Sequence, residues 1–197
     1  MSSQWLQNHM GATLSDEEME KIPNPKFEVG VHVVIKFMQA GGILGTWLFG
    51  PIAAVRKSET RNLQCLRMKM GKCGRAGVFI GIPLGMAASY AQTSKCDEYR
   101  NWDRCYRLRH NRGQVRADQA SAVGSIGGAA IGYATGAGAW FGGLMGMSAL
   151  MLAAAIYTSK MDTKEKKEGQ KAKERNDAKA KKEVDASGKV DASGKVE

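Results

Sequence analysis

The uncharged sequence QASAVGSIGGAAIGYATGAGAWFGGLMGMSALMLAAAIYTS fills residues 119–159 and decides the fold that we expect for this chain. A single helix of these 41 residues would be about 61 Å long at about 1.5 Å per residue, roughly twice the hydrocarbon thickness of a bilayer. We therefore expect the run to fold back on itself. The glycine-rich stretch 136–143 is the predicted turn.

Two further stretches, residues 37–55 and 76–94, also lack charged side chains. Each is long enough to cross a bilayer as a helix, which takes about 20 residues. The sequence thus predicts an all-α membrane protein with four glycine-rich transmembrane helices, polar termini and both chain ends on the same side. The predicted spans cover about residues 34–55, 75–94, 119–138 and 142–159. The alternative is a water-soluble helical bundle. However, no polar residues alternate with the apolar ones, so these helices would have no polar face to expose to water.

The charged residues lie mostly outside these runs and define the predicted domain organisation. The chain has 197 residues, with 29 Lys and Arg against 19 Asp and Glu and a formal net charge of +10, a length that excludes a large multidomain enzyme. Ser15 and Glu18 have the spacing of a capping box and predict a short helix before Pro23. We expect an acidic N-terminal segment over residues 1–30, a four-helix membrane domain over 31–159 and a charged, largely disordered tail over 160–197.

The tail ends in two copies of the sequence VDASGK, over residues 184–189 and 190–195. This repeat is too polar to bury apolar surface and is typical of a disordered segment. The stretch 160–183 has the alternative of a solvated helix, because its charges alternate in sign and it contains almost no apolar residue.

Glycines recur at intervals of four within the predicted spans. Residues four apart share one face of a helix, so such spacing lets two helix backbones approach closely in a membrane. Shorter versions of the pattern occur at Gly41 with Gly45 and at Gly142 with Gly146. The predicted helix-packing residues are Gly77, Gly81, Gly85, Gly124, Gly127, Gly128, Gly132 and Gly136.

This glycine register resembles the superfamily of inner-mitochondrial-membrane translocase subunits of 17, 22 and 23 kDa, whose members have four short, glycine-rich spans. The superfamily signature places an Arg before the third span and a Gly-Gly-x3-Gly motif within it. Here Arg116 is followed, after ten residues, by Gly127, Gly128 and Gly132. The Asp that the signature expects four residues after the Arg falls on Ala120. The resemblance covers about residues 30–160.

The resemblance implies a multi-pass protein of the mitochondrial inner membrane with both termini towards the intermembrane space. The superfamily contains protein-translocating subunits and also a structural member, the accessory alpha-subcomplex subunit 11 of respiratory complex I. A translocase is expected to keep charged groups at membrane depth, whereas Lys36 lies near the end of its span. We therefore expect an accessory subunit in contact with other subunits of the membrane arm, with a translocase subunit for protein import as the alternative.

The resemblance also places the loop over residues 93–118 in the intermembrane space, where disulfides can form. Cys96 and Cys105 lie in this loop and are either bridged or two free thiols. Cys65 and Cys73 are then expected to face the matrix and to stay reduced.

The same loop mixes basic and aromatic side chains. In isolation this composition would suit RNA. Between two membrane spans it favours contact with anionic lipid such as cardiolipin, or with acidic loops of neighbouring subunits. Arg116 is alternatively expected to pair with Asp118 or with a partner's carboxylate. The predicted lipid or subunit contacts are Arg104, Arg107, Arg109, Arg112, Arg116 and Trp102.

The sequence shows no arrangement of residues that is typical of catalysis. His9, His32 and His110 occur in separate segments, and no Ser, His and Asp order suggests nucleophilic chemistry. The cysteine pairs lack the spacing of a structural zinc site. We therefore predict no catalytic residue, no metal site, no cofactor and no enzymatic activity.

Overall fold

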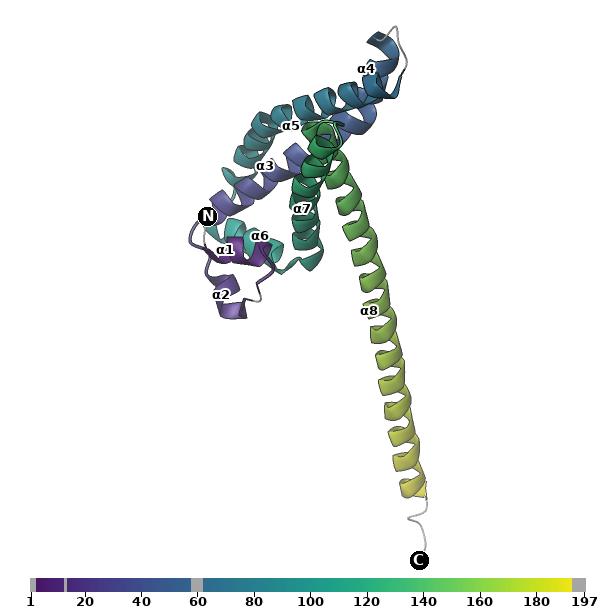
Figure 1. Cartoon of the computed structure of the whole chain (residues 1–197). Helices are drawn as coiled ribbons and strands as arrows, with labels where there is room; N and C mark the ends of the chain where they lie inside the picture. The colour runs from purple at the N-terminus through teal and green to yellow at the C-terminus, as the bar shows by residue number, and fades with distance from the viewer. Residues whose placement is uncertain (1–2, 13, 58–61, 193–197) are drawn as a thin grey trace, which may run out of the picture. The chain divides into compact units, whose positions relative to one another are not determined.

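Figure 1 shows the computed structural model of the chain, which describes residues 3–12, 14–57 and 62–192. The described part is helical and contains no β-strand, so the predicted all-α class is confirmed. The chain divides into two compact units, of which the first ends at Ala155 and the second begins at Ile156. The elements are α1 (Ser3–His9), α2 (Asp16–Glu20), α3 (Pro25–Leu44), the π-helical segment η1 (Gly45–Phe49), α4 (Gly50–Lys57), α5 (Leu63–Thr93), α6 (Glu98–His110), α7 (Arg112–Ala134) and α8 (Ala139–Ala192).

The short N-terminal helix α2 begins with the predicted capping box. The Glu18 amide donates to the Ser15 hydroxyl oxygen at 3.3 Å, and the Ser15 amide donates to the Glu18 carboxylate at 3.0 Å. These two bonds satisfy backbone donors that the first turn of a helix leaves open. Pro25 then occupies the first position of α3, where a missing amide hydrogen costs nothing.

Helices α3 and α5 lie side by side, because glycines bring their backbones into contact (Figure 1). A Cβ atom added to Gly41 would lie less than 3.0 Å from the Gly77 carbonyl, and one added to Gly77 would lie equally close to Gly41. The contact continues along α5, where Gly81 faces the backbone of Phe37 and Gly85 faces that of Val34. No larger residue fits at these positions without moving the helices apart.

The uncharged run over residues 119–159 folds back on itself, as expected from its length. Helix α7 ends at Ala134 and α8 begins at Ala139. Within the turn, Gly136 has φ of 68° and Gly138 has φ of 96°, a backbone region that glycine enters without strain. The reversal therefore lies at the beginning of the glycine-rich stretch that the sequence indicated.

The two arms of this hairpin also meet backbone to backbone. Gly124 faces Gly146, and Gly128 faces Gly142. Gly132 packs against the carbonyl of Gly138 and the Cα of Gly142. A Cβ atom added to any of the helical glycines in these contacts, Gly124, Gly128, Gly132, Gly142 or Gly146, would lie less than 3.0 Å from backbone atoms across the hairpin. The glycine register thus sets the distance between α7 and the start of α8.

Two of the predicted packing glycines do not take part in these contacts. A Cβ atom added to Gly127 would meet nothing within 4 Å, because this residue lies on another face of α7 than Gly124, Gly128 and Gly132. Gly136 has equally open surroundings and lies beyond the end of α7 in the turn, where its positive φ rather than close packing favours glycine. The prediction of a packing role for these two residues is wrong.

Within the described part of the chain, two helical segments, rather than the expected four, are long and apolar enough to cross a membrane. They are Pro25–Arg56 and Ala139–Asn176. Helix α5 carries Arg67, Lys69, Lys72 and Arg75 in its first half, and α7 begins with a charged turn. Both helices also contain many glycines and alanines, which add little hydropathy. Because of these residues and the charges, neither helix resembles a membrane span by composition.

The second unit differs from the largely disordered tail that the sequence predicted. Helix α8 continues through it as far as Ala192, and the end of the VDASGK repeat lies outside the described residues. Between Ile156 and Asn176 the side chains are mostly exposed. Lys164 and Glu168 form an ion pair at 3.9 Å along the helix. This segment corresponds to the solvated helix that was the alternative for residues 160–183.

Glycine substitution separates packing from helix propensity. Gly128→Ala is expected to lower the free energy of unfolding in detergent by about 1–3 kcal/mol, because its methyl group would push α7 away from Gly142. Gly127→Ala adds the same methyl group to open space and is expected to leave stability unchanged or to raise it by up to about 1 kcal/mol. Thermal unfolding of the two variants measures the difference, and equal midpoints would contradict the backbone contact.

Candidate functional site

A buried ion pair joins α6 to the start of α3. Arg109 donates through Nη2 and Nε to the Glu28 carboxylate at 2.7–3.1 Å, and each side chain is 1% exposed. The same guanidinium also donates to the carbonyls of Met19 at 3.1 Å and Lys21 at 3.3 Å. This single side chain therefore connects α6 to α3, to the last turn of α2 and to the residue that follows α2.

Helix α6 was expected to be part of a polar loop, and its periodicity explains why it is a helix. Its buried residues are Asn101, Cys105 and Arg109, which recur every four positions and so share one face. The Asn101 side-chain amide donates to the carbonyls of Cys96 and Asp97, both at 3.2 Å. Two of these three buried residues are polar, and the apolar side chains of α6 that pack beside Cys105, namely Trp102, Tyr106 and Leu108, stand among basic residues, which is why the sequence did not reveal the helix.

Cys105 lies beside the Glu28 and Arg109 pair and is a free thiol. Its Sγ donates to the Glu28 carboxylate at 3.1 Å. Burial, together with the hydrogen bond to Glu28 and its negative charge, raises the pKa of Cys105 to about 12. Cys96 is also a free thiol, so the bridge between these two residues, one of the alternatives left open by the sequence, is not formed.

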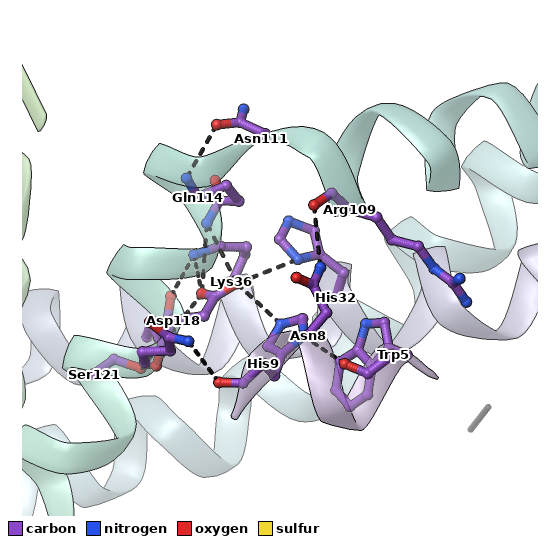
Figure 2. A network of polar contacts seen from close by, with 12 residues as sticks. Trp5, Asn8, His9, His32, Lys36, Arg109, Asn111, Gln114, Asp118 and Ser121 are labelled. Carbon is purple, nitrogen blue, oxygen red and sulfur yellow. Dashed lines mark hydrogen bonds and ion pairs between the residues drawn. The ribbon is translucent and has the colours of Figure 1, made fainter. Parts of the chain in front are cut away.

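A second polar cluster surrounds Asp118 at the start of α7 (Figure 2). Lys36 of α3 forms an ion pair with Asp118 Oδ1 and also donates to Gln39 Oε1 at 3.0 Å. His9 Nε2 and His32 Nδ1 lie 3.8 and 3.6 Å from Asp118 Oδ2. Three positively charged or titratable side chains from α1 and α3 thus converge on one carboxylate of α7.

Neutral side chains complete the hydrogen bonds of this cluster. The Gln39 amide donates to Asp118 Oδ1 at 3.3 Å and to the Ser121 hydroxyl at 2.7 Å. Burial raises the pKa of Asp118, but the neighbouring His9, the hydrogen bond and positive charge of Lys36 and the hydrogen bond from Gln39 lower it further than burial raises it. Its pKa is therefore well below the usual range, and the carboxylate is ionised at neutral pH.

Hydrogen bonds around the cluster also hold α1 against α6 and α7. The Gln119 amide donates to the His9 carbonyl at 2.8 Å, and the Asn8 amide donates to the Arg109 carbonyl at 3.1 Å. The Trp5 ring contacts the His9 ring in a tilted arrangement, with ring centroids 4.1 Å apart. A cavity with room for about one water molecule lies between the Glu28 and Asp118 clusters. The N-terminal segment, α6 and the starts of α3 and α7 are thereby tied together at one place.

The predicted lipid and subunit contacts take different positions. The prediction of a lipid or subunit contact for Arg109 is wrong, because this side chain is buried against Glu28 and cannot reach a headgroup. Trp102 is partly buried, donates to the Glu20 carbonyl at 3.2 Å and stacks on Tyr106. The remaining predicted contacts have partly or fully exposed side chains: Arg104, Arg107, Arg112 and Arg116.

Sequence reasoning missed most of the two clusters. Lys36 was expected to reach the membrane interface and instead pairs with Asp118, for which Arg116 was considered as the partner. His9 and His32 are far apart in the sequence, and only the fold brings them to the same carboxylate. The available signal was the position of Lys36 and Asp118 as isolated charges beside long uncharged runs. Among the described residues, no group of three or more His, Cys, Asp or Glu side chains could hold a metal ion.

The fold and these clusters define an all-helical protein whose helices pack through glycine and whose buried polar groups gather where α1, α3, α6 and α7 meet. Over residues 5–157 the chain matches the model of a family described as a protein of unknown function (DUF1757), and it belongs to this family. The match includes both clusters and all of the glycine contacts, and it ends close to Ile156, where the second unit begins. A comparison with curated proteins finds no match.

The Glu28 and Arg109 pair predicts a strong dependence of stability on Glu28. Glu28→Gln leaves the buried guanidinium without its counter-charge and is expected to destabilise the protein by about 3–5 kcal/mol. The matched control is Asp103→Asn, which removes an ion pair with Arg107 on the exposed face of α6 and should cost less than about 1 kcal/mol. Denaturant unfolding compares the two variants, and similar losses would argue against a structural role of the buried pair.

The environment of Cys105 predicts low thiol reactivity. At about pH 8 a thiol of pKa about 12 is ionised in roughly one molecule in ten thousand, and the thiolate is the reactive form. Native protein treated with iodoacetamide should therefore carry the label on Cys96 but not on Cys105, as read by peptide mass spectrometry. Denatured protein is the control and should be labelled at both positions. Rapid labelling of native Cys105 would show that its burial beside Glu28 is not maintained.

Proposed function

We propose that this protein is a non-catalytic subunit of a membrane complex. In this proposal α3, α5, α7 and the first part of α8 all enter the bilayer. The observation that carries this proposal is the inverted distribution of side chains. The buried residues of α5 include Gly71, Gly74, Gly81 and Gly85, and those of α7 are Asp118, Ser121, Gly124 and Gly132. The outward residues include Phe79, Ile80, Leu84, Val123, Ile126 and Ile131, which are 54–74% exposed.

This arrangement is the reverse of a water-soluble core. In water, burial of large apolar side chains supplies most of the stability, and small or polar interiors contribute little. In lipid, the outward face is expected to be apolar, and helices associate through small residues and interhelical hydrogen bonds. The failure of α5 and α7 to resemble spans by composition is therefore compatible with membrane insertion, because they expose their largest apolar residues and bury their glycines.

The charged cluster supports a position at the membrane boundary. Lys36 and Asp118 immediately precede the uncharged stretches of α3 and α7. A charge is costly at the bilayer centre and is tolerated near a helix end, especially when it is paired. We infer that this end of the helices lies at the interface and that the uncharged lengths extend into the hydrocarbon.

Within this proposal, the resemblance to the 17, 22 and 23 kDa superfamily favours an accessory subunit of mitochondrial respiratory complex I. Backbone contacts between α3 and α5, and between α7 and the first part of α8, favour a rigid structural element. Such a subunit would stabilise the membrane arm through its apolar outer face and through anionic lipid. Both termini would lie in the intermembrane space.

A translocase subunit for protein import is the second candidate, and one observation favours it. A cavity of about 460 Å³ opens between α3, α7 and the first part of α8. Its wall includes the polar side chains Gln39, Ser121 and Ser125. The rest of the lining is apolar, including Trp140 and Leu144, so the polar surface offered to a substrate is small.

Fractionation of mitochondria tests this proposal. The chain should stay in the pellet after alkaline carbonate extraction and should migrate with NADH dehydrogenase activity on native gels in mild detergent. Gly128→Leu should reduce that co-migration, whereas Gly127→Leu, which points to open space, should leave it intact. Migration with presequence-binding components would favour the translocase. Release of the chain by carbonate would exclude both roles, because neither is possible outside the membrane.

A further inference from the structure

A groove of about 590 Å³ lies between α6, the first half of α3 and the end of α5. Its lining contains the cationic side chains of Lys36, Arg104 and Arg107 together with the imidazole of His32, and no carboxylate among the residues that the structure describes there. Apolar side chains, including Val33, Phe37 and Leu108, form another part of the same lining. The groove is therefore amphipathic, with positive charge and apolar surface side by side.

We propose that this groove binds one anionic phospholipid, with its phosphate at Arg104 and Arg107 and an acyl chain along Val33 and Phe37. The proposal rests on the membrane insertion proposed above and names a lipid site for it. Of the six residues that the sequence indicated for lipid or subunit contact, it assigns two to a defined site and excludes Arg109, which is committed to Glu28.

The basic side chains retain the capacity to bind a phosphate. Arg104 donates to the Gln92 carbonyl at 3.4 Å, while a guanidinium has five N–H donors. Arg107 pairs with Asp103, but its side chain is 70% exposed and can turn towards a ligand. Lys36 uses two of its three donors on Asp118 and Gln39. Guanidinium groups bind phosphate oxygens in pairs, which suits a phosphodiester better than a single point charge does.

The position of the groove in the sequence fits a lipid rather than a soluble anion. Lys36 is the last charge before the uncharged stretch 37–55, and Gln92 lies near the end of the uncharged stretch 76–94. The groove thus lies where the charged and uncharged parts of α3 and α5 meet, at the depth of headgroups. Phe37, which is 38% exposed, begins the apolar part. A free phosphate would gain nothing from this apolar wall, whereas an acyl chain would.

Lipid binding to the purified full-length protein tests the site. Native mass spectrometry in neutral detergent would compare phosphatidylglycerol with phosphatidylcholine of the same acyl chains. We expect one phosphatidylglycerol to bind in preference, and Arg104→Gln with Arg107→Gln to weaken its binding about tenfold or more, since a basic residue contributes about 1 kcal/mol towards anionic lipid. Arg100→Gln with Arg112→Gln removes the same charge from exposed positions outside the groove and should change binding little.

Three results would overturn the proposal. These are equal binding of the two lipids by the wild-type protein, an equal loss in the control pair, and displacement of the bound lipid by glycerol phosphate, which has the anion but no acyl chain. Carbonate extraction reports membrane insertion separately. A protein that resists extraction but shows no preference for phosphatidylglycerol would disprove the lipid site and leave the proposed membrane role intact.

Discussion

The contact between helix backbones at glycine is the constraint on which the rest of the first unit depends. Gly41 meets Gly77, and Gly128 meets Gly142, at distances that no Cβ atom could share. At such separations the attraction comes from van der Waals contact and weak Cα–H···O bonds, both of which fall steeply with distance. A single methyl group would therefore remove much of the interaction along its stretch of helix. Many large apolar side chains of α5 and α7 therefore point outwards, away from the partner helix.

The polar clusters follow from this packing. Where two backbones come together, the contact itself has no room for large apolar side chains, and few of them, such as Met70, Leu144 and Met147, are buried. Much of the remaining interior is occupied by small or hydrogen-bonded groups. Where α1 and α6 meet α3 and α7, the interior contains Glu28 with Arg109 and Lys36 with Asp118. Each charge has a partner and further hydrogen bonds, which is the condition for keeping it buried. These pairs fix which segments meet, and the glycines fix how closely they meet.

The proposed role and the proposed lipid site depend on the same inversion of inside and outside. An apolar outer face needs lipid or protein around it. The charged cluster at one end of the uncharged helix segments would then lie at the membrane interface. The groove beside α6 lies at this boundary and combines the two properties, since Arg104 and Phe37 line the same space. A structural subunit and a translocase subunit would share this arrangement. They differ in whether the cavity beside Gln39 and Ser121 receives a substrate or stays filled by lipid and side chains.

The sequence by itself determined the helical class, the reversal near Gly136, the capping box at Ser15 and most of the close-packing positions, because each depends on residues that are neighbours in the chain or recur at a helical interval. It placed Gly127 on the wrong face, since an adjacent pair of glycines does not reveal which member faces the partner helix. It also missed α6, whose buried face is polar. Only the tertiary structure decided that His9 and His32 share Asp118 and that Arg109 belongs to Glu28. Those pairings join residues about 80 to 110 positions apart, and no local pattern encodes a partner at such a distance.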